Sequence, residues 1–201
     1  ITATNTPRLD YSTGAEAFLL EPQSTNIITQ SEDFSQWIDD TDTSITSNAI
    51  ISPDGTQNAD KLIAGNSVAR QAIKFNLTVS GDIVMSVFAK KGEYSVLQFS
   101  DARDPSLYAN FDIENGTIGA SNIIVSSIQD YGNGWYRCVG VYNSLNDIIS
   151  FRISITENST DGRLINFSGN NSDGLYIWGA QVEQKSYATS YIPSEGSQTT
   201  R

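Results

Sequence analysis

The chain has 201 residues, with 12 basic and 23 acidic side chains, no histidine and a net charge of −11. Nucleic acids and anionic lipid surfaces repel such a protein, and no apolar run reaches the ~20 residues of a membrane-spanning helix. We therefore expect neither nucleic acid binding nor membrane insertion. The absence of histidine excludes Ser-His-Asp and Cys-His mechanisms and every His-ligated metal site.

The two ends of the chain are rich in Thr, Ser and Gly and lack the alternation that is typical of strands. We predict an N-terminal connector (1–22) that packs on the main domain, a single β-domain (23–185) and a C-terminal connector (186–201). The connectors are expected to join neighbouring domains of a longer chain or other proteins.

The main domain begins with a short strand in "STNIITQSEDFSQW" (24–37), followed by a turn that carries Glu32 and Asp33. A Pro-Asp-Gly turn in "SPDGTQNADKLIA" (52–64) then leads into another strand. Further along, apolar residues alternate with polar ones in segments rich in Val, Ile, Tyr and Phe. These segments predict strands at 81–91, 94–100, 107–113, 121–128, 134–143, 147–155 and 174–183.

Turn residues separate the predicted strands. The Asn-Gly pair in "ENGT" (114–117) and the Gly-Asn-Gly sequence in "DYGNGW" (130–135) are typical of hairpins. Several short strands with turn chemistry between them predict an all-β fold, a two-sheet antiparallel β-sandwich or barrel. The single cysteine, Cys138, lies within a predicted strand and is expected to be a buried small apolar residue.

The last predicted strand, "GLYIWGAQVE" (174–183), is apolar on both faces. Strict alternation would place Leu175 and Ile177 on one face, and Tyr176, Trp178 and the apolar residues after it on the other. We expect the chain's own ends to cover the second face, with the aromatic tail (187–192) as part of the cover. A partner chain and a ligand are the alternatives.

The remaining chemistry is that of carboxylates. Paired carboxylates are the machinery of glycoside hydrolysis, but every candidate here lies in a turn or at a strand end, where solvated acids are normal. We expect no enzymatic activity. The candidates are Glu32 and Asp33, Asp39 and Asp40, Asp101 and Asp104, and Glu114. An acidic turn also suits a structural calcium ion, and no other cofactor is expected.

Aromatic side chains are the remaining candidates for ligand binding, because sugars stack their C–H faces on aromatic rings while polar groups bind the hydroxyls. The chain offers a glycan platform of this kind. Its candidate members are Trp37, Tyr94, Asp101, Arg103, Asp104 and Tyr108. The alternative is that each aromatic ring is only half-buried packing beneath a loop.

Four motifs in this order carry a resemblance to a known family: "FLLEPQSTNIITQSEDFSQW", "SPDGTQNADKL", "GNGWYRCVGVY" and "GLYIWGAQVEQKSYATSYIPSEGSQTTR". They resemble a module of tailed-phage and prophage proteins that is found in tail fibres and other virion surface proteins. The resemblance covers nearly the whole chain. It implies a location on the virion surface, other virion proteins as partners, and a homo-oligomer such as a trimer.

More distantly, the chain is similar to jelly-roll carbohydrate-binding modules. Asn26-Ile27-Ile28 with Phe34, and Leu175-Tyr176-Ile177, match the first and last strands of those modules. The resemblance implies a jelly-roll sandwich whose first and last strands are neighbours. Those modules carry acidic residues for calcium in the last strand, where this chain has Trp178 and Gly179, so that only Glu32 and Asp33 would remain as ligands.

The leading hypothesis is a non-enzymatic module of a phage tail fibre or surface decoration, used for structural attachment and adhesion to a bacterial surface glycan. The alternative is an accessory carbohydrate-binding domain of a secreted bacterial enzyme or adhesin. A carboxylate-based glycan hydrolase is the third hypothesis.

Overall fold

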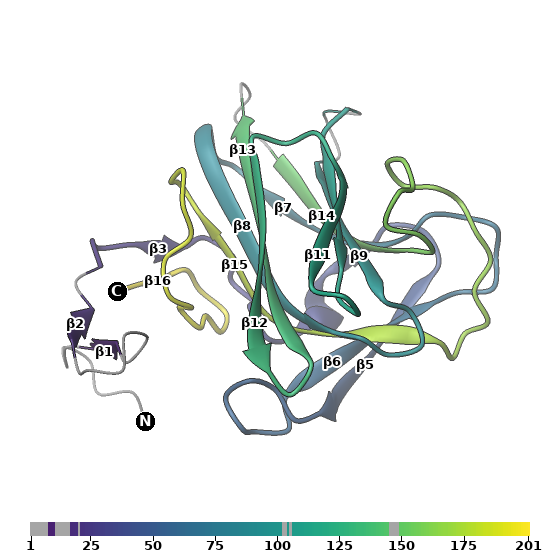
Figure 1. Ribbon diagram of the computed structural model, residues 1–201, viewed down its shortest axis with the longest axis horizontal. Helices are drawn as coiled ribbons and strands as arrows, with labels where there is room; N and C mark the ends of the chain where they lie inside the picture. The colour runs from purple at the N-terminus through teal and green to yellow at the C-terminus, as the bar shows by residue number, and fades with distance from the viewer. Residues whose placement is uncertain (1–7, 11–16, 20, 102–103, 105, 145–148) are drawn as a thin grey trace.

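The computed structural model describes residues 8–10, 17–19, 21–101, 104, 106–144 and 149–201. The core of the fold is formed by two six-stranded sheets that face each other, as Figure 1 shows. Every strand pair within the two sheets is antiparallel. The predicted two-sheet antiparallel β-sandwich is therefore confirmed.

Each sheet has four central strands and an edge strand on either side. The first sheet runs in the order β11 (Thr117–Ser121), β10 (Tyr108–Asp112), β9 (Val96–Asp101), β14 (Ile149–Thr156), β7 (Gln71–Leu77) and β4 (Ile38–Asp39). The second sheet runs in the order β12 (Val125–Gly132), β13 (Trp135–Ser144), β8 (Gly81–Lys90), β15 (Gly174–Glu183), β6 (Ala59–Ala64) and β5 (Thr43–Ile50). The chain changes sheet at each step from β6 to β9 and again from β13 to β15, which is the winding of a jelly roll.

Smaller elements lie outside these sheets. A 3-10 turn, η1 (Phe34–Gln36), precedes β4, while β1 (Arg8–Asp10) and β2 (Ala17–Leu19) form a separate pair. The strand β3 (Thr25–Asn26) pairs with β16 (Thr199–Thr200). The packing of the N-terminal connector on the sandwich falls mostly outside the described residues and stays a prediction. None of the described helices is long and apolar enough to cross a membrane.

The core lies between the two sheets and is built by alternation. Along β14, Phe151, Ile153 and Ile155 point inward and are buried, so Arg152 and Ser154 point outward. Cys138 on β13 is fully buried, and burial raises the pKa of its thiol, as expected for an unreactive small apolar residue. The inward faces thus supply the stability, while the outward faces remain available for other roles.

The predicted hairpins are present, since β10 pairs with β11 and β12 pairs with β13. Two of the longer strands, β5 and β7, were not predicted. The edge strand β5 reads "TSITSNAI", with one Ile among four exposed or half-buried polar residues before Asn48, so its apolar period is weak. The strand β7 reads "QAIKFNL", where Lys74 and Asn76 alternate with apolar residues over only five positions, because Gln71 and Ala72 at its start do not follow the pattern.

The closing strand β15 departs from the strict alternation expected of it. A β-bulge lies between Trp178 and Gln181, where Gly179 adopts a φ of 64°. The extra residue returns Ala180 and Val182 to the inter-sheet core, on the same face as Leu175 and Ile177. Strict alternation placed these two residues on the other face, and this prediction was wrong because the bulge changes the phase of the strand.

The outward face of β15 is covered by the chain's own C-terminal tail. Tyr191 packs on Trp178 with ring centroids 4.7 Å apart, and it also contacts Phe88 at 5.9 Å. The expected cover is thus confirmed for Tyr191, although Tyr187 is 51% exposed and does not contribute. The first strand lies beside the last, as the resemblance implied, because the backbone N–H of Ile27 donates to the Val182 carbonyl at 2.8 Å.

Candidate functional site

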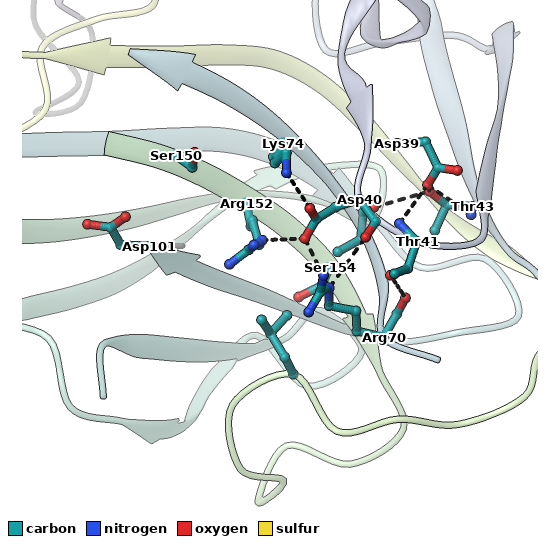
Figure 2. Close-up of polar contacts among 12 residues, drawn as sticks. Asp39, Asp40, Thr41, Thr43, Arg70, Lys74, Asp101, Ser150, Arg152 and Ser154 are labelled. Carbon is teal, nitrogen blue, oxygen red and sulfur yellow. Dashed lines mark hydrogen bonds and ion pairs between the residues drawn. The ribbon is translucent and has the colours of Figure 1, made fainter. Parts of the chain in front are cut away.

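One cluster of charged side chains occupies the outward face of the first sheet, over β7 and β14. Its centre is Asp40, whose side chain is only 3% exposed. Lys74 Nζ lies 2.6 Å from Asp40 Oδ1, and Arg152 Nε lies 2.5 Å from Asp40 Oδ2. Arg70 Nε lies 3.0 Å from the same Oδ2. Figure 2 shows the three cationic side chains converging on this carboxylate.

The sheet register explains why these side chains meet. Arg152 on β14 is paired directly with Lys74 on β7, so both side chains stand next to each other on the outward face. Asp40 follows β4 at the edge of the sheet, and its backbone N–H donates to the Ala72 carbonyl at 2.9 Å. Burial acts to raise the pKa of Asp40, but the hydrogen bonds from Lys74 and Arg152 and the charges of the two arginines outweigh it. The net effect holds the pKa of Asp40 below its usual value.

A fourth cation, Arg163, stands beside this cluster. Its Nη2 donates to the backbone carbonyl of Asp101 at 2.6 Å, while its buried Nε has no hydrogen-bond partner in the described part of the chain. Burial and the like charges of Arg152 and Arg70 lower the pKa of Arg163. We call the outward surface formed by Asp40, Arg70, Lys74, Arg152 and Arg163 the basic face.

Neutral polar side chains continue the same sheet face toward β9 and β10. Gln98 is fully buried, and its side-chain amide donates to Asn110 Oδ1 at 2.7 Å and to the backbone carbonyl of Gly162 at 3.0 Å. Asn110 in turn donates to the Ser159 carbonyl at 3.1 Å. The loop between β14 and β15 therefore covers this half of the face, and it also supplies Arg163 to the basic face, where only Arg70 and Lys74 keep partly exposed side chains next to Asp40.

A second polar region is a cleft of about 720 Å³, lined by the predicted calcium ligands Glu32 and Asp33 together with Asp60, Glu195, Asn48, Asn58 and other polar residues. We call it the acidic cleft. No cation is among its lining residues. Among the residues that the structure describes, no group of three or more acidic, His or Cys side chains is arranged to hold a metal ion. The calcium site stays a prediction.

The buried Asp60 and the half-buried Glu32 of the acidic cleft already have protein partners. Asp60 accepts hydrogen bonds from the backbone N–H groups of Phe34 at 3.0 Å and Asn48 at 2.9 Å. Glu32 accepts from Tyr191 Oη at 2.9 Å and from Asn58 Nδ2 at 2.9 Å. Burial raises the pKa of each of the two carboxyl groups, because these hydrogen bonds only partly offset the loss of hydration.

The predicted aromatic platform does not assemble in one place. Trp37 is 6% exposed and packs in the core against Phe34, Phe75 and Phe151, so neither face of its ring is open to a sugar. Trp37 lies between η1 and β4, outside both elements, but its buried ring contradicts the predicted role as a sugar-stacking surface. The short segment around it turns the ring inward, and its Nε1 donates to the Gln30 carbonyl at 3.0 Å.

The other predicted glycan ligands are divided between the two ends of β9. Tyr94 precedes the strand and packs on Phe167 with ring centroids 5.5 Å apart. Tyr108 is half-buried and pairs with Ser100, so it lies next to Asp101 at the far end. Asp104 accepts hydrogen bonds from Ser106. Arg103 lies outside the described residues.

The predicted carboxylate pairs also separate. Asp39 is exposed and accepts hydrogen bonds within its own turn, from Thr41 and Thr43, whereas Asp40 is buried among cations. Sequence reasoning missed the basic residues of the basic face. The available signal was weak: Lys74 and Arg152 each occupy the polar phase of an apolar alternation, but nothing in the sequence indicates that the two strands are neighbours.

Comparisons with known proteins add little to this geometry. No family model and no curated protein matches the chain. Among solved structures, the chain is similar to the enzymatically active domain of tailspike protein 4 of bacteriophage CBA120, with 15% sequence identity and a TM-score of 0.39. The match covers 78% of this chain and 21% of that chain, so this chain spans about a fifth of its length. The similarity is too low to indicate a shared activity.

Proposed function

We propose that the chain is a non-enzymatic module of a phage virion, in a tail fibre or surface decoration, that attaches to neighbouring virion parts and adheres to a glycan of the host surface. The sequence motifs that resemble tail-fibre modules support the location. The adhesive role rests on one observation, the basic face. An outward sheet surface carries fixed hydrogen-bond donors there, and two of them, Arg70 and Lys74, are partly exposed.

The attachment role is supported by the meeting of the two connectors. The backbones of Ser24 and Arg201 exchange hydrogen bonds at 3.2 and 2.9 Å, and Arg201 also forms an ion pair with Glu21 at 2.6 Å. Both ends of the sandwich domain thus leave it at the same point. Neighbouring virion parts would be joined there, away from the rest of the surface.

The non-enzymatic character is supported by the partners of the cleft carboxylates. A glycoside hydrolase needs one carboxylic acid that gives its proton to the leaving group and a second carboxylate that acts on the sugar or on water. Here both oxygens of Asp60 accept backbone N–H groups, and Glu32 is held by Tyr191 and Asn58. These contacts join distant segments of the chain, which is a structural role.

The test has two parts. Antibodies against the purified protein should label intact phage particles in electron micrographs, and the protein should adhere to host cells but not to cells whose surface polysaccharide has been removed. Labelling absent from particles, combined with the same adhesion, would favour the accessory domain of a secreted bacterial enzyme or adhesin. Release of reducing sugar ends from the polysaccharide, lost in Glu32→Gln, would establish the hydrolase instead.

A further inference from the structure

The charges of the basic face are arranged differently from the other ion pairs of the described chain. Lys61 pairs with Glu93, Lys91 with Glu114 and Arg201 with Glu21, one cation to one carboxylate. In the basic face a single carboxylate, Asp40, serves three cations. In a protein with a net charge of −11, Asp40 is therefore surrounded by more cations than carboxylates.

Among the described groups that act on Asp40 or Arg163, these two included, cations outnumber carboxylates by four to three. The charges of Arg152, Arg70, Asp101 and Asp104 all act on Arg163, so these groups share one neighbourhood. The described cations are Arg70, Lys74, Arg152 and Arg163, and the described carboxylates are Asp40, Asp101 and Asp104. Like charges held this close repel one another, and an anion placed among them would relieve the repulsion.

Two of the cations are accessible and have donors to spare. The side chain of Arg70 is 38% exposed and that of Lys74 is 25% exposed. Arg70 uses Nε for Asp40, and its terminal nitrogens donate no hydrogen bond within the described residues. Lys74 uses its ammonium group for Asp40 Oδ1, which occupies one of three N–H donors. Free guanidinium nitrogens suit the two oxygens of a carboxylate or phosphate group.

The remaining outward side chains fit a sugar acid better than a neutral sugar. Neutral glycans are held largely by stacking on exposed aromatic rings. Of the outward side chains of β7 and β14, only Lys74, Asn76 and Ser150 are not buried, and none of the three is aromatic. The hydroxyl of Ser150 and the amide of Asn76 are hydrogen-bonded to each other at 2.5 Å and offer further groups to sugar hydroxyls.

We propose that the basic face binds the acidic groups of an anionic glycan, with Arg70 and Lys74 as the accessible contacts and Arg152 and Asp40 holding them in place. This inference rests on the proposed adhesion to a host glycan and names the chemical class of that glycan. Carboxylate and phosphate groups present the same chemistry to these donors. Uronic acid polymers and glycerol phosphate polymers are the two sources that an experiment must separate.

The experiment measures binding of the whole protein by calorimetry to polygalacturonate, to a glycerol phosphate teichoic acid and to neutral dextran. The variants are Arg70→Gln and Lys74→Gln, each of which leaves Asp40 two cationic partners. Lys91→Gln is the matched control, because it removes one positive charge from a side chain that is 41% exposed and pairs elsewhere, with Glu114. Circular dichroism and thermal melts confirm that each variant is folded.

We expect binding to one or both anionic polymers and none to dextran, with a loss of about tenfold in affinity in each variant of the basic face and no change in Lys91→Gln. The affinity should fall as salt rises from 20 to 300 mM, because ions screen the contact. Binding to dextran alone, no binding to either anionic polymer at 20 mM salt, or equal affinity in all variants would overturn the inference. Unchanged adhesion of both variants to host cells would also overturn the inference about the basic face, but it would not contradict adhesion to a host glycan. If the wild-type protein does not adhere to host cells, the proposed function itself is wrong.

Discussion

The basic face and the acidic cleft each contain a buried aspartate, and the pKa values of the two shift in opposite directions. Asp40 is surrounded by Lys74, Arg152 and Arg70, which lower its pKa, whereas Asp60 has only two backbone N–H donors and its pKa is raised by burial. Two buried aspartates therefore differ in the free energy of carrying a negative charge. Nearby cations favour the charged form of Asp40, whereas burial disfavours the charged form of Asp60. The difference indicates that Asp40 organises cations, while Asp60 fixes backbone.

Buried polar groups have two different roles in this β-sandwich domain. The hydrogen bonds of Asp60 reach the segments around Phe34 and Asn48, which flank β4 and β5 at the edge of the fold. The ion pairs of Asp40 fix the positions of cationic side chains whose outer parts stay exposed. On this comparison, we propose that the region around Asp40 receives a ligand and that the region around Asp60 does not.

The largest effect is expected for Asp40→Asn. The substitution keeps the shape of the side chain but removes the only carboxylate that Arg152, 9% exposed, contacts by an ion pair in the described chain. A buried cation without its partner is costly, and we expect a loss of about 3 kcal/mol in the free energy of unfolding, measured by urea titration. The control is Glu114→Gln, which breaks an exposed pair and should cost less than about 1 kcal/mol. Equal costs in the two variants would contradict the central role of Asp40.

A smaller effect is expected for Asp60→Asn. The amide that replaces one carboxylate oxygen brings an N–H group against a backbone N–H, so one of the two backbone donors loses its acceptor. We expect a loss of about 2 kcal/mol in the free energy of unfolding. A cost larger than that of Asp40→Asn, in the same urea titration, would reverse the proposed ranking of the two regions.

The pH dependence of these two costs should have opposite signs. The pKa of Asp40 in the folded state lies below the usual 3.8, so its contribution is complete above pH 3.8 and is lost as the pH falls through the folded pKa. The pKa of Asp60 is raised, so its contribution is complete below pH 3.8 and decreases as the pH rises through the folded pKa. Urea titrations between pH 2.5 and 7 should show the cost of Asp40→Asn shrinking toward acid and that of Asp60→Asn shrinking toward neutral pH. Parallel trends would show that the two aspartates have similar surroundings.

The smallest effect is expected for Tyr191→Phe in the acidic cleft. The change removes the hydroxyl that donates to Glu32 and also contacts Ser31 Oγ at 2.8 Å, but keeps the ring that covers Trp178. We expect a loss of about 1 kcal/mol in the free energy of unfolding and a further rise in the pKa of Glu32, which NMR titration would follow. Affinity for anionic glycans should not change. A drop in that affinity would tie the cleft to ligand binding.

The sequence predicted the fold well where local chemistry dictates it. Alternating runs and Asn-Gly or Gly-Asn-Gly turns placed β8 to β10 and β13 to β15, because each of these signals is contained in a few neighbouring residues. The strand predicted at 121–128 instead spans the end of β11, a connection and the first half of β12. The bulge at Gly179 was missed because a glycine in an apolar run gives no indication of which way the chain shifts. The weakly patterned edge strand β5 was missed for a related reason, since little of it is buried.

The candidate site could be predicted only in part. Asp40 belonged to a recognised carboxylate pair, but its partners Lys74 and Arg152 lie 34 and 112 positions away along the chain. Charges brought together by sheet register leave no local pattern in the sequence. Trp37 shows the converse problem, because a Trp near two acidic residues resembles a surface sugar platform whether its ring points outward or into the core.

The most direct test of the account is an NMR titration of the isotope-labelled protein with polygalacturonate and with teichoic acid. We predict that resonances of Arg70, Lys74 and Arg152 shift in a saturable way with at least one of the two polymers. Resonances of Glu32 and Asp60 should not change. Shifts confined to the acidic cleft, or no saturable shift with either polymer at low salt, would contradict this prediction.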